Sequence, residues 1–219
     1  WLINGAPVGA CVIADQQTQG RGRMGRTWET PPNSAIALSV ILNPPHDALP
    51  QVMMLGALAV AETLSALGAA DVGIKWPNDV LFNGLKVCGV LAEAEWHDQA
   101  LRGVILGIGL NVRVNFSGSP LAYTATSIET ELGRVVDRAD VLAVLLGRID
   151  AWRDQLGSTT LYEAWRARLI TLGDRVSVSY GIHTYEGQAV NVLADGALVI
   201  EDSSGTRHTI YAGDVSTQG

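Results

Sequence analysis

The sequence predicts an α/β protein of the α+β type, in which a larger part with a mainly antiparallel sheet precedes a small β-barrel. Two observations predict this division. Up to residue 171, apolar runs of strand length alternate with stretches whose apolar side chains recur at helical spacing. From residue 172 onward only short strands remain, separated by turn residues at the spacing typical of a small barrel. The predicted domains are residues 1–171 and residues 172–219.

The first predicted elements are two strands and a helix. Residues 10–14 and 35–42 are apolar runs, consistent with buried strands. In residues 49–67 the apolar side chains keep near-helical spacing, and Gly68 stands where helices commonly end. This stretch is therefore expected to form a helix of the core.

Further strands are expected to complete the sheet. Pro77 stops the first of them, and Asn83-Gly84 is a strong signal for a type I′ turn between the next two. The predicted strands cover residues 72–76, 80–82, 85–90, 86–95 and 103–112, where the third and fourth runs overlap.

Two helices and four short strands are expected after the sheet. Asp137 or Asp140 can cap a helix that runs to Gly157. Thr160 and Glu163 have the spacing of a capping box at the start of a second helix. The strands of the C-terminal barrel are predicted at residues 175–180, 184–192, 197–202 and 207–211.

Composition excludes several classes of protein. The chain is 47% hydrophobic and 17% charged, too apolar for disorder, and no run of 18 apolar residues predicts a membrane span. A formal net charge of −7 argues against nucleic-acid binding, which relies on many Lys and Arg contacts to phosphates. Cys11 and Cys88 lack the spacing of a metal site or disulfide framework, so both are expected to be buried, reduced thiols of a cytoplasmic protein. Because the chain starts at Trp1 without a Met, upstream residues are expected.

Arginine and glycine concentrate in residues 20–26, which we call the arginine loop. It holds three arginines, Arg21, Arg23 and Arg26, of the 15 Lys and Arg in the chain. Glycines let backbone N–H groups approach a ligand, and guanidinium groups offer forked donors that match carboxylate and phosphate oxygens. The loop is therefore expected to bind an anion. The alternatives are a solvated basic turn and a fragment of an RNA-binding Arg-Gly tract, although such tracts repeat and this one does not.

Both lysines of the chain lie close together in the sequence. Lys75 opens the segment Lys-Trp-Pro-Asn-Asp, residues 75–79, at the end of a predicted strand, and Lys86 follows shortly after. Pro-Asn-Asp is ordinary turn chemistry, so a surface turn is one interpretation. Where every other cation is Arg, however, a lysine can be needed as a compact point charge, which makes Lys75 a candidate for chemistry.

Two other segments contain candidate ligand contacts. Residues 107–111, Gly-Ile-Gly-Leu-Asn, lack the third glycine and the strand-to-helix turn of a dinucleotide fingerprint, which excludes that interpretation. Either a close approach of the backbone to a ligand or a bend in the strand remains. Residues 125–128, Ala-Thr-Ser-Ile, are typical of a plain helix N-terminus. The sequence has no Gly-x4-Gly-Lys-Ser/Thr phosphate loop, zinc helix motif or Gly-x-Ser-x-Gly elbow.

The order of these segments carries more information than any one of them. The chain contains, in succession, Gln17, residues 20–28, residues 75–79, Lys-Val-Cys-Gly-Val-Leu-Ala-Glu at residues 86–93, and residues 107–111. In order and spacing these segments closely resemble those of the biotin protein ligase family. Gly213-Asp214-Val215 is similar to the Gly-Glu-Val at the end of that family's small C-terminal barrel. The resemblance implies a class II synthetase-like catalytic domain followed by an SH3-like β-barrel. The family's Ser-Thr-Asn contact to biotin would lie upstream of Trp1.

The resemblance implies an ATP-dependent biotin ligase. Biotin and ATP, with Mg²⁺, would give biotinyl-5′-AMP and pyrophosphate, and the biotinyl group would pass to one lysine in the biotin carboxyl carrier domain of a biotin-dependent carboxylase. The alternatives are a lipoate or octanoyl ligase or transferase of the same fold, and a sensor that binds biotinyl adenylate without catalysis. Neither nucleic acid nor a membrane is an expected partner of this chain, because of its negative net charge and its lack of a long apolar run. A helix-turn-helix, which some relatives carry, is not seen in residues 1–219. An exposed sheet edge would permit a homodimer.

The resemblance also assigns site residues. Lys75, Arg21 and Arg23 are expected to be catalytic, because cations must offset the repulsion between the biotin carboxylate and the α-phosphate. The expected biotin contacts are Gln17, Gly20, Arg21, Gly22, Arg23, Lys75, Gly107 and Gly109. The expected ATP contacts are Arg23, Arg26, Trp28, Asn78, Asn111, Thr126 and Ser127, with Arg26 facing the outgoing phosphates. No metal ligand is assigned, since the ATP phosphates are expected to hold most of the Mg²⁺ coordination.

Overall fold

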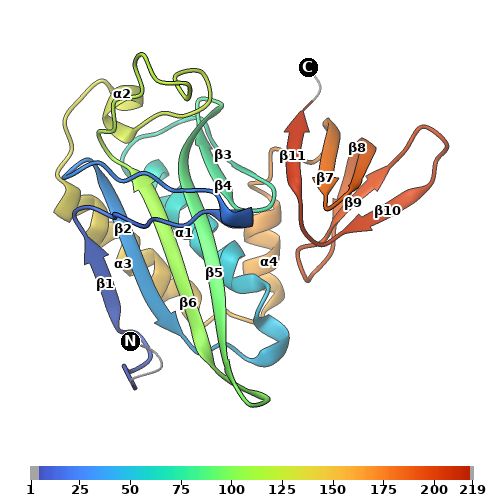
Figure 1. The fold of residues 1–219 in the computed structure, drawn as a ribbon, viewed down its shortest axis with the longest axis horizontal. Helices are drawn as coiled ribbons and strands as arrows, with labels where there is room; N and C mark the ends of the chain where they lie inside the picture. Colours follow the sequence, from blue (N-terminus) through green and yellow to red (C-terminus); the bar gives the residue numbers. More distant parts are fainter. Residues whose placement is uncertain (1–4, 218–219) are drawn as a thin grey trace.

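The structure, a computed structural model, describes residues 5–217, and these contain two antiparallel sheets (Figure 1). The larger sheet has the strand order β1-β2-β6-β5-β4-β3, and all neighbouring strands in it are antiparallel. Its strands are β1 (Cys11–Ala14), β2 (Ala35–Leu42), β3 (Val72–Lys75), β4 (Asp79–Phe82), β5 (Leu85–His97) and β6 (Ala100–Asn111). The predicted α+β architecture with a mainly antiparallel sheet is confirmed.

Helices cover one face of the larger sheet (Figure 1). The helix α1 (Gln51–Ala66) packs directly on the sheet, and α3 (Arg138–Arg153) and α4 (Thr159–Arg166) pack on α1. Gly56 in α1 permits this close packing, since a Cβ there would lie only 2.7 Å from a methyl carbon of Val90 and 2.8 Å from one of Leu106. The apolar core therefore lies between the helices and the sheet. The short helices are η2 (Arg23–Gly25), η3 (His46–Ala48) and α2 (Ile128–Leu132).

Several elements form where the sequence predicts them. β2 spans the predicted residues 35–42, and α1 is followed by Gly68, whose φ of +94° only glycine adopts easily. Asn83 and Gly84 both have positive φ, 49° and 78°, and join β4 to β5 as the type I′ signal requires. These signals are local, which is why the sequence alone contains them.

The strand predicted at residues 10–14 forms as β1, but the prediction that it is buried was wrong. Among residues 5–217, β1 pairs with β2 alone and is an edge strand of the sheet, and most of its side chains are exposed. Cys11 in β1 is exposed, whereas Cys88 in β5 is buried. The predicted burial therefore holds only for Cys88. An apolar run does not distinguish a central strand from an edge strand, because that difference depends on what packs beside it.

The helix caps agree with the sequence in one case and differ in the other. Asp137 caps α3, since its Oδ1 accepts a hydrogen bond from the Ala139 N–H at 2.7 Å, but the helix ends before Gly157. The α4 helix begins after Ser158, whose Oγ accepts from the Leu161 N–H at 3.2 Å. The capping box proposed from Thr160 and Glu163 was therefore wrong. Ser158, two residues before Thr160, is the N-cap residue instead.

A five-stranded antiparallel sheet, which we call the C-terminal sheet, follows the helices with the order β10-β9-β8-β7-β11. Its strands are β7 (Arg175–Tyr180), β8 (His183–Val192), β9 (Leu198–Glu201), β10 (Arg207–Ile210) and β11 (Asp214–Thr217). The four predicted strands are confirmed, and β11 is an additional one. Within residues 5–217, β10 and β11 are the end strands and are not paired with each other. Closure into an SH3-like barrel stays a prediction, as does the domain boundary after residue 171.

Hydrogen bonds connect the two parts of the molecule. The Trp76 indole Nε1–H donates to the Gly196 carbonyl at 2.7 Å, and the Tyr162 hydroxyl donates to the Val192 carbonyl at 2.8 Å. The C-terminal sheet is thereby fixed beside the end of β3, close to the segment that contains Lys75. In the described part of the chain, no helix combines the length and the apolar character needed to cross a membrane.

Candidate functional site

The arginine loop lies on the face of the larger sheet that is opposite α1 (Figure 1). Two isolated antiparallel bridges close its base, one between Gln17 and Thr30 and the other between Arg21 and Thr27. In addition, the Thr30 hydroxyl donates to Oε1 of Gln17 at 3.3 Å. The loop is thus a folded structure held by its own backbone, and Gln17 lies at its base.

Two glycines allow the loop to fold this tightly. A Cβ on Gly20 would lie 2.2 Å from the Trp28 carbonyl oxygen and 3.1 Å from Oε1 of Gln17. The Gly20 carbonyl itself accepts from the Trp28 N–H at 2.9 Å, and the Gly22 N–H donates to the Arg26 carbonyl at 2.7 Å. Gly20 is therefore required for the close approach of the two arms of the loop.

The indole of Trp28 packs on glycines of the sheet. A Cβ on Gly109 would lie 2.4 Å from Cε2 of the indole, and one on Gly89 would lie 3.3 Å from Cζ3. A Cβ on Gly107, on the same face of β6, would meet only Leu91, at an ordinary 3.5 Å from its carbonyl oxygen and 3.9 Å from its Cβ. Gly109 thus makes room for a side chain of this protein, while Gly107 leaves the backbone open. The predicted contacts of both glycines with biotin stay predictions.

The structure brings Lys86 to the loop. Its Nζ lies 2.7 Å from Oδ1 of Asp79 and 5.6 Å from the centroid of the Trp28 ring, a cation–π distance. Lys75, by contrast, makes no side-chain hydrogen bond or ion pair with any of the residues 5–217. The sequence interpretation favoured Lys75 and passed over Lys86. The signal for Lys86 was present, because it is the other of two lysines and opens the 86–93 motif.

Arg23 is half-buried, whereas Arg21 and Arg26 are exposed. Its Nη1 donates to Oδ1 of Asn78 at 3.1 Å, and its Nη2 donates to the Gly213 carbonyl at 3.3 Å. Asn78 is buried and in turn donates from Nδ2 to the Val90 carbonyl. Burial lowers the pKa of Arg23, and the nearby Asp214 carboxylate acts against that shift.

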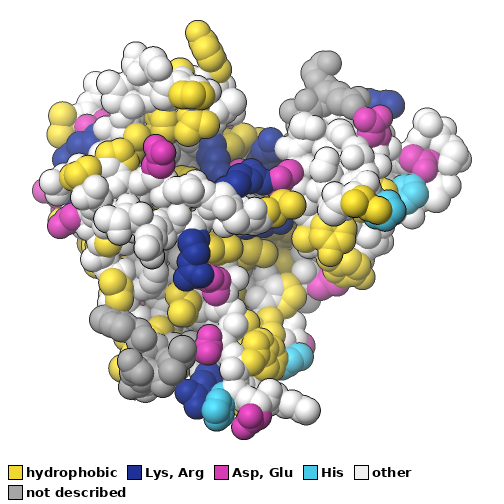
Figure 2. Space-filling view, in the orientation of Figure 1, with side chains coloured by type: hydrophobic (Ala, Val, Ile, Leu, Met, Phe, Trp, Pro, Cys, Tyr) yellow, Lys and Arg dark blue, Asp and Glu magenta, His cyan; other side chains and the backbone are white. Residues whose placement is uncertain are grey.

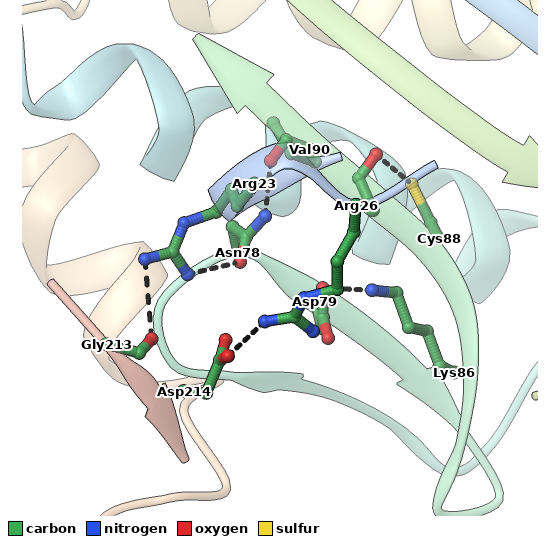
Figure 3. Close-up of polar contacts among 10 residues, drawn as sticks. Arg23, Arg26, Asn78, Asp79, Lys86, Cys88, Val90, Gly213 and Asp214 are labelled. Atoms are coloured by element: carbon green, nitrogen blue, oxygen red, sulfur yellow. Dashed lines mark hydrogen bonds and ion pairs between the residues drawn. The ribbon is translucent and has the colours of Figure 1, made fainter. Parts of the chain in front are cut away.

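The other two arginines reach different elements. Arg21 forms an ion pair with Glu93 of β5, with 3.2 Å between Nη1 and Oε1. Arg26 forms an ion pair with Asp214 at the start of β11 (Figure 3). Figure 2 shows basic side chains gathering where the two parts of the molecule meet, with acidic side chains beside them. The loop is thus held by both sheets.

The residues predicted to contact ATP at the end of β6 lie together, and their polar side chains form hydrogen bonds within this region of the protein. Asn111 is buried and donates from Nδ2 to the Thr126 carbonyl at 3.1 Å. The hydroxyl of Thr126 donates to Glu131, and that of Ser127 is 2.8 Å from the hydroxyl of Thr130. The Thr126 N–H also donates to the Lys86 carbonyl at 2.9 Å. These contacts place the segment beside Lys86, and a role in ATP binding stays a prediction.

Comparison with known proteins agrees with this arrangement of loop, sheet and C-terminal strands. The family model described as the biotin/lipoate A/B protein ligase family matches residues 1–111, and the biotin protein ligase C terminal domain matches residues 171–217. The chain therefore belongs to the biotin protein ligase family, whose matched domains cover both the arginine loop and the C-terminal sheet.

Individual relatives and solved structures show the same likeness. The biotin--[acetyl-CoA-carboxylase] ligase of Paracoccus denitrificans is 35% identical, over 98% of this chain and 92% of that protein. The bifunctional ligase/repressor BirA of Bacillus subtilis is also 35% identical, over 97% of this chain and 67% of that protein. Among solved structures, the biotin protein ligase from Aquifex aeolicus in complex with biotin and ATP has a TM-score of 0.82 at 30% identity, covering 98% of this chain and 90% of that one.

Proposed function

We propose that the arginine loop and the residues that hold it form the adenylation site of an ATP-dependent biotin ligase. Membership of the family makes the chain an adenylate-forming ligase that couples biotin to protein. One observation supports the location most strongly: the loop arginines and the Lys86 ammonium gather beside a strip of sheet that carries Gly89, Gly107 and Gly109. Trp28 packs on Gly89 and Gly109, so an uncharged ring can lie against the backbone at Gly107 while cations bind the anionic end of the ligand.

The reaction has two steps, and both need positive charge. First, an oxygen of the biotin carboxylate attacks the α-phosphate of ATP, and the bond from that phosphorus to the bridging oxygen of the β-phosphate breaks. Biotinyl-5′-AMP and pyrophosphate result. Then the amine of an acceptor lysine attacks the biotinyl carbonyl, AMP leaves with the bonding electron pair, and the nitrogen loses a proton to give the amide. Because two anions must meet in the first step, fixed cations lower its barrier.

The three arginines would contact different parts of the substrates, according to their positions in the loop. Arg21 and Arg23, with the backbone of Gly22, would hold the biotin carboxylate and the acyl-phosphate linkage of the adenylate. Arg26 would face the leaving pyrophosphate. The contacts of Arg23 support this division, because Asn78 and Gly213 fix two of its nitrogens and orient the rest of the guanidinium group.

A lysine would bridge the biotin carboxylate and the α-phosphate. The sequence assigned this task to Lys75, whereas the contacts support Lys86, which lies beside Trp28 and Asp79. We therefore assign the bridging charge to Lys86 and keep Lys75 as the competing candidate. Asp79 would hold the ammonium in place before ATP binds.

Biotin would bind over the glycine strip. Its bicyclic urea has little charge, so a few placed donors and apolar walls must supply most of the affinity. Gln17 suits the urea because its Oε1 already accepts from Thr30, which leaves its NH2 group to donate. Gly107 would let the backbone approach the ligand closely, and Gly20 would contact the ligand through its own backbone atoms.

ATP would lie toward the other end of the loop. The candidate contacts are Arg23, Arg26, Trp28, Asn78, Asn111, Thr126 and Ser127. Residues 5–217 hold no cluster of three or more His, Cys, Asp or Glu that could bind a metal ion. ATP would arrive as its magnesium complex, in which the phosphates supply most of the oxygen ligands.

The acceptor would be a lysine in the biotin carboxyl carrier domain of a biotin-dependent carboxylase, as the names of two relatives suggest. The protein would act in the cytoplasm, where Cys11 and Cys88, both free, stay reduced. A homodimer could form through the exposed edge strand β1. Residues 1–171 would form the catalytic domain and residues 172–219 the C-terminal domain.

Pyrophosphate exchange into ATP tests the proposal. The exchange should require biotin and should not occur with lipoate or octanoate, because only the cognate acid completes the first step. If exchange follows lipoate or octanoate instead, the chain is a different acyl ligase of the same fold. Labelling of a purified carrier domain then separates a ligase from a sensor, which would form the adenylate and transfer nothing.

A further inference from the structure

Two arginines of the loop are held by the C-terminal sheet. Arg26 pairs with the Asp214 carboxylate, and Arg23 donates to the carbonyl of the neighbouring Gly213 (Figure 3). Both acceptors lie where β11 begins, nearly two hundred residues along the chain from the loop. The arginine loop, which packs on the larger sheet, is therefore held in part by hydrogen-bond acceptors at the start of β11 in the C-terminal sheet.

The backbone at this point is shaped to present those acceptors. A Cβ on Gly213 would lie 2.7 Å from Cγ1 of Val178 and 2.8 Å from the Ser179 carbonyl oxygen, so no side chain fits there. Asp214 itself pairs with Ser179 in the β11–β7 ladder, which fixes the direction of its Cα–Cβ bond. The carbonyl and the carboxylate are thus held by the strand rather than by a flexible tail.

Asp214 also balances the charge of the two arginines. The two guanidinium groups contact the neighbouring residues Gly213 and Asp214, so their charges lie near each other. Burial lowers the pKa of Arg23, the Asp214 and Asp79 carboxylates act against that shift, and the positive charge of Arg26 adds to it. A carboxylate that attracts both allows them to stay side by side on the same face of the loop.

We propose that Asp214 is a positioning residue for adenylation: it holds Arg26, beside Arg23, in the orientation that meets the phosphates of ATP. The inference rests on the proposed role of Arg26 toward the leaving pyrophosphate. Since pyrophosphate is absent from the second step, Asp214 should matter for making biotinyl-5′-AMP and not for using it. The C-terminal sheet is then part of the adenylation site.

Separate assays of the two steps test this inference. Asp214→Asn should raise the KM for ATP in biotin-dependent pyrophosphate exchange by about threefold to fivefold, as expected for loss of a partly exposed ion pair. Transfer from supplied biotinyl-5′-AMP to a carrier domain should change by less than about twofold. Asp214→Glu, which keeps the charge, should restore most of the exchange.

A matched control uses another ion pair of the same sheet. Glu201 of β9 pairs with Arg207 of β10 at 2.9 Å and touches no residue of the loop, so Glu201→Gln should leave both steps unchanged. If Asp214→Asn behaves like this control, or slows both steps equally together with a lower melting temperature, the inference is wrong.

A double variant, Asp214→Asn combined with Arg26→Ala, tests whether Asp214 acts through Arg26. In the Arg26→Ala background, Asp214→Asn should add nothing further to the KM for ATP, because the group that it positions is gone. Additive effects of the two substitutions would overturn the inference. If Arg26→Ala alone leaves exchange unchanged, the proposed role of Arg26 itself fails. An effect of Arg26→Ala without one of Asp214→Asn would overturn only the positioning role.

Discussion

Arg23 connects the arginine loop to two segments that are distant from it in the sequence. Its guanidinium contacts Asn78, which directly precedes β4, and the carbonyl of Gly213, which directly precedes β11, and Arg23 is half-buried. Although burial lowers its pKa, an arginine remains charged in proteins, so a positive charge stays in the site before any ligand binds. Lysine could not make both of these contacts in a fixed plane.

The two lysines give the first prediction at the residue scale. Lys86→Ala should lower biotin-dependent pyrophosphate exchange by about 10- to 100-fold, the equivalent of one charge-assisted hydrogen bond in the transition state. Lys75→Ala should lower it much less, because the Lys75 side chain has no hydrogen-bond or ion-pair partner among residues 5–217. Exchange rates of both variants, with melting temperatures as a folding control, decide between them. A larger loss in Lys75→Ala would reverse the assignment.

A second prediction concerns the packing of Trp28. Gly109→Ala should destabilise the protein by about 1–3 kcal/mol, because the new methyl group overlaps the indole and must displace it. Gly107→Ala is the matched control, since its Cβ would meet only Leu91, with no contact shorter than 3.5 Å. Denaturant unfolding of the two variants measures the difference. Equal free energies of unfolding would contradict the described position of Trp28.

At the scale of elements, the accuracy of the sequence predictions depends on whether a signal is local. The Asn83-Gly84 turn and the Gly68 helix end were predicted correctly because each conformation is a property of the residues themselves. The start of α4 was misplaced because Ser158 and Thr160 are both acceptable caps, and the structure uses the first. The exposure of β1 was missed because it depends on the absence of a covering element.

The position of β1 at the sheet edge leads to a prediction about thiol reactivity. In the folded protein, iodoacetamide should alkylate Cys11 and leave Cys88 unmodified at neutral pH. Cys11 is exposed, whereas burial raises the pKa of the Cys88 thiol, and a raised pKa means that less of the reactive thiolate is present. Mass spectrometry should find one modified cysteine in the native protein and two after denaturation. Rapid native modification of Cys88 would contradict the described core.

For the whole molecule, the sequence contained the parts of the site but not their assembly. The arginine loop, the 75–79 segment and the glycines of β6 were identified as candidates from composition and order. The contacts of Arg23 with Gly213 and of Arg26 with Asp214 were not, because β11 was not predicted as a strand and these residues are distant from the loop in the sequence. Lys86 was likewise overlooked, since its distance from Trp28 follows from the packing of the loop on the sheet.

The central claim is that the arginine loop performs biotin adenylation, and pyrophosphate exchange into ATP measures this most directly. Wild-type protein should catalyse exchange only when biotin is present. Arg23→Ala should lose about 10²-fold or more of that activity while remaining folded, because the proposed charge-assisted contacts of Arg23 with the biotin carboxylate and the acyl-phosphate linkage are removed. Exchange that does not depend on biotin, or that survives Arg23→Ala at the wild-type rate, would contradict the account.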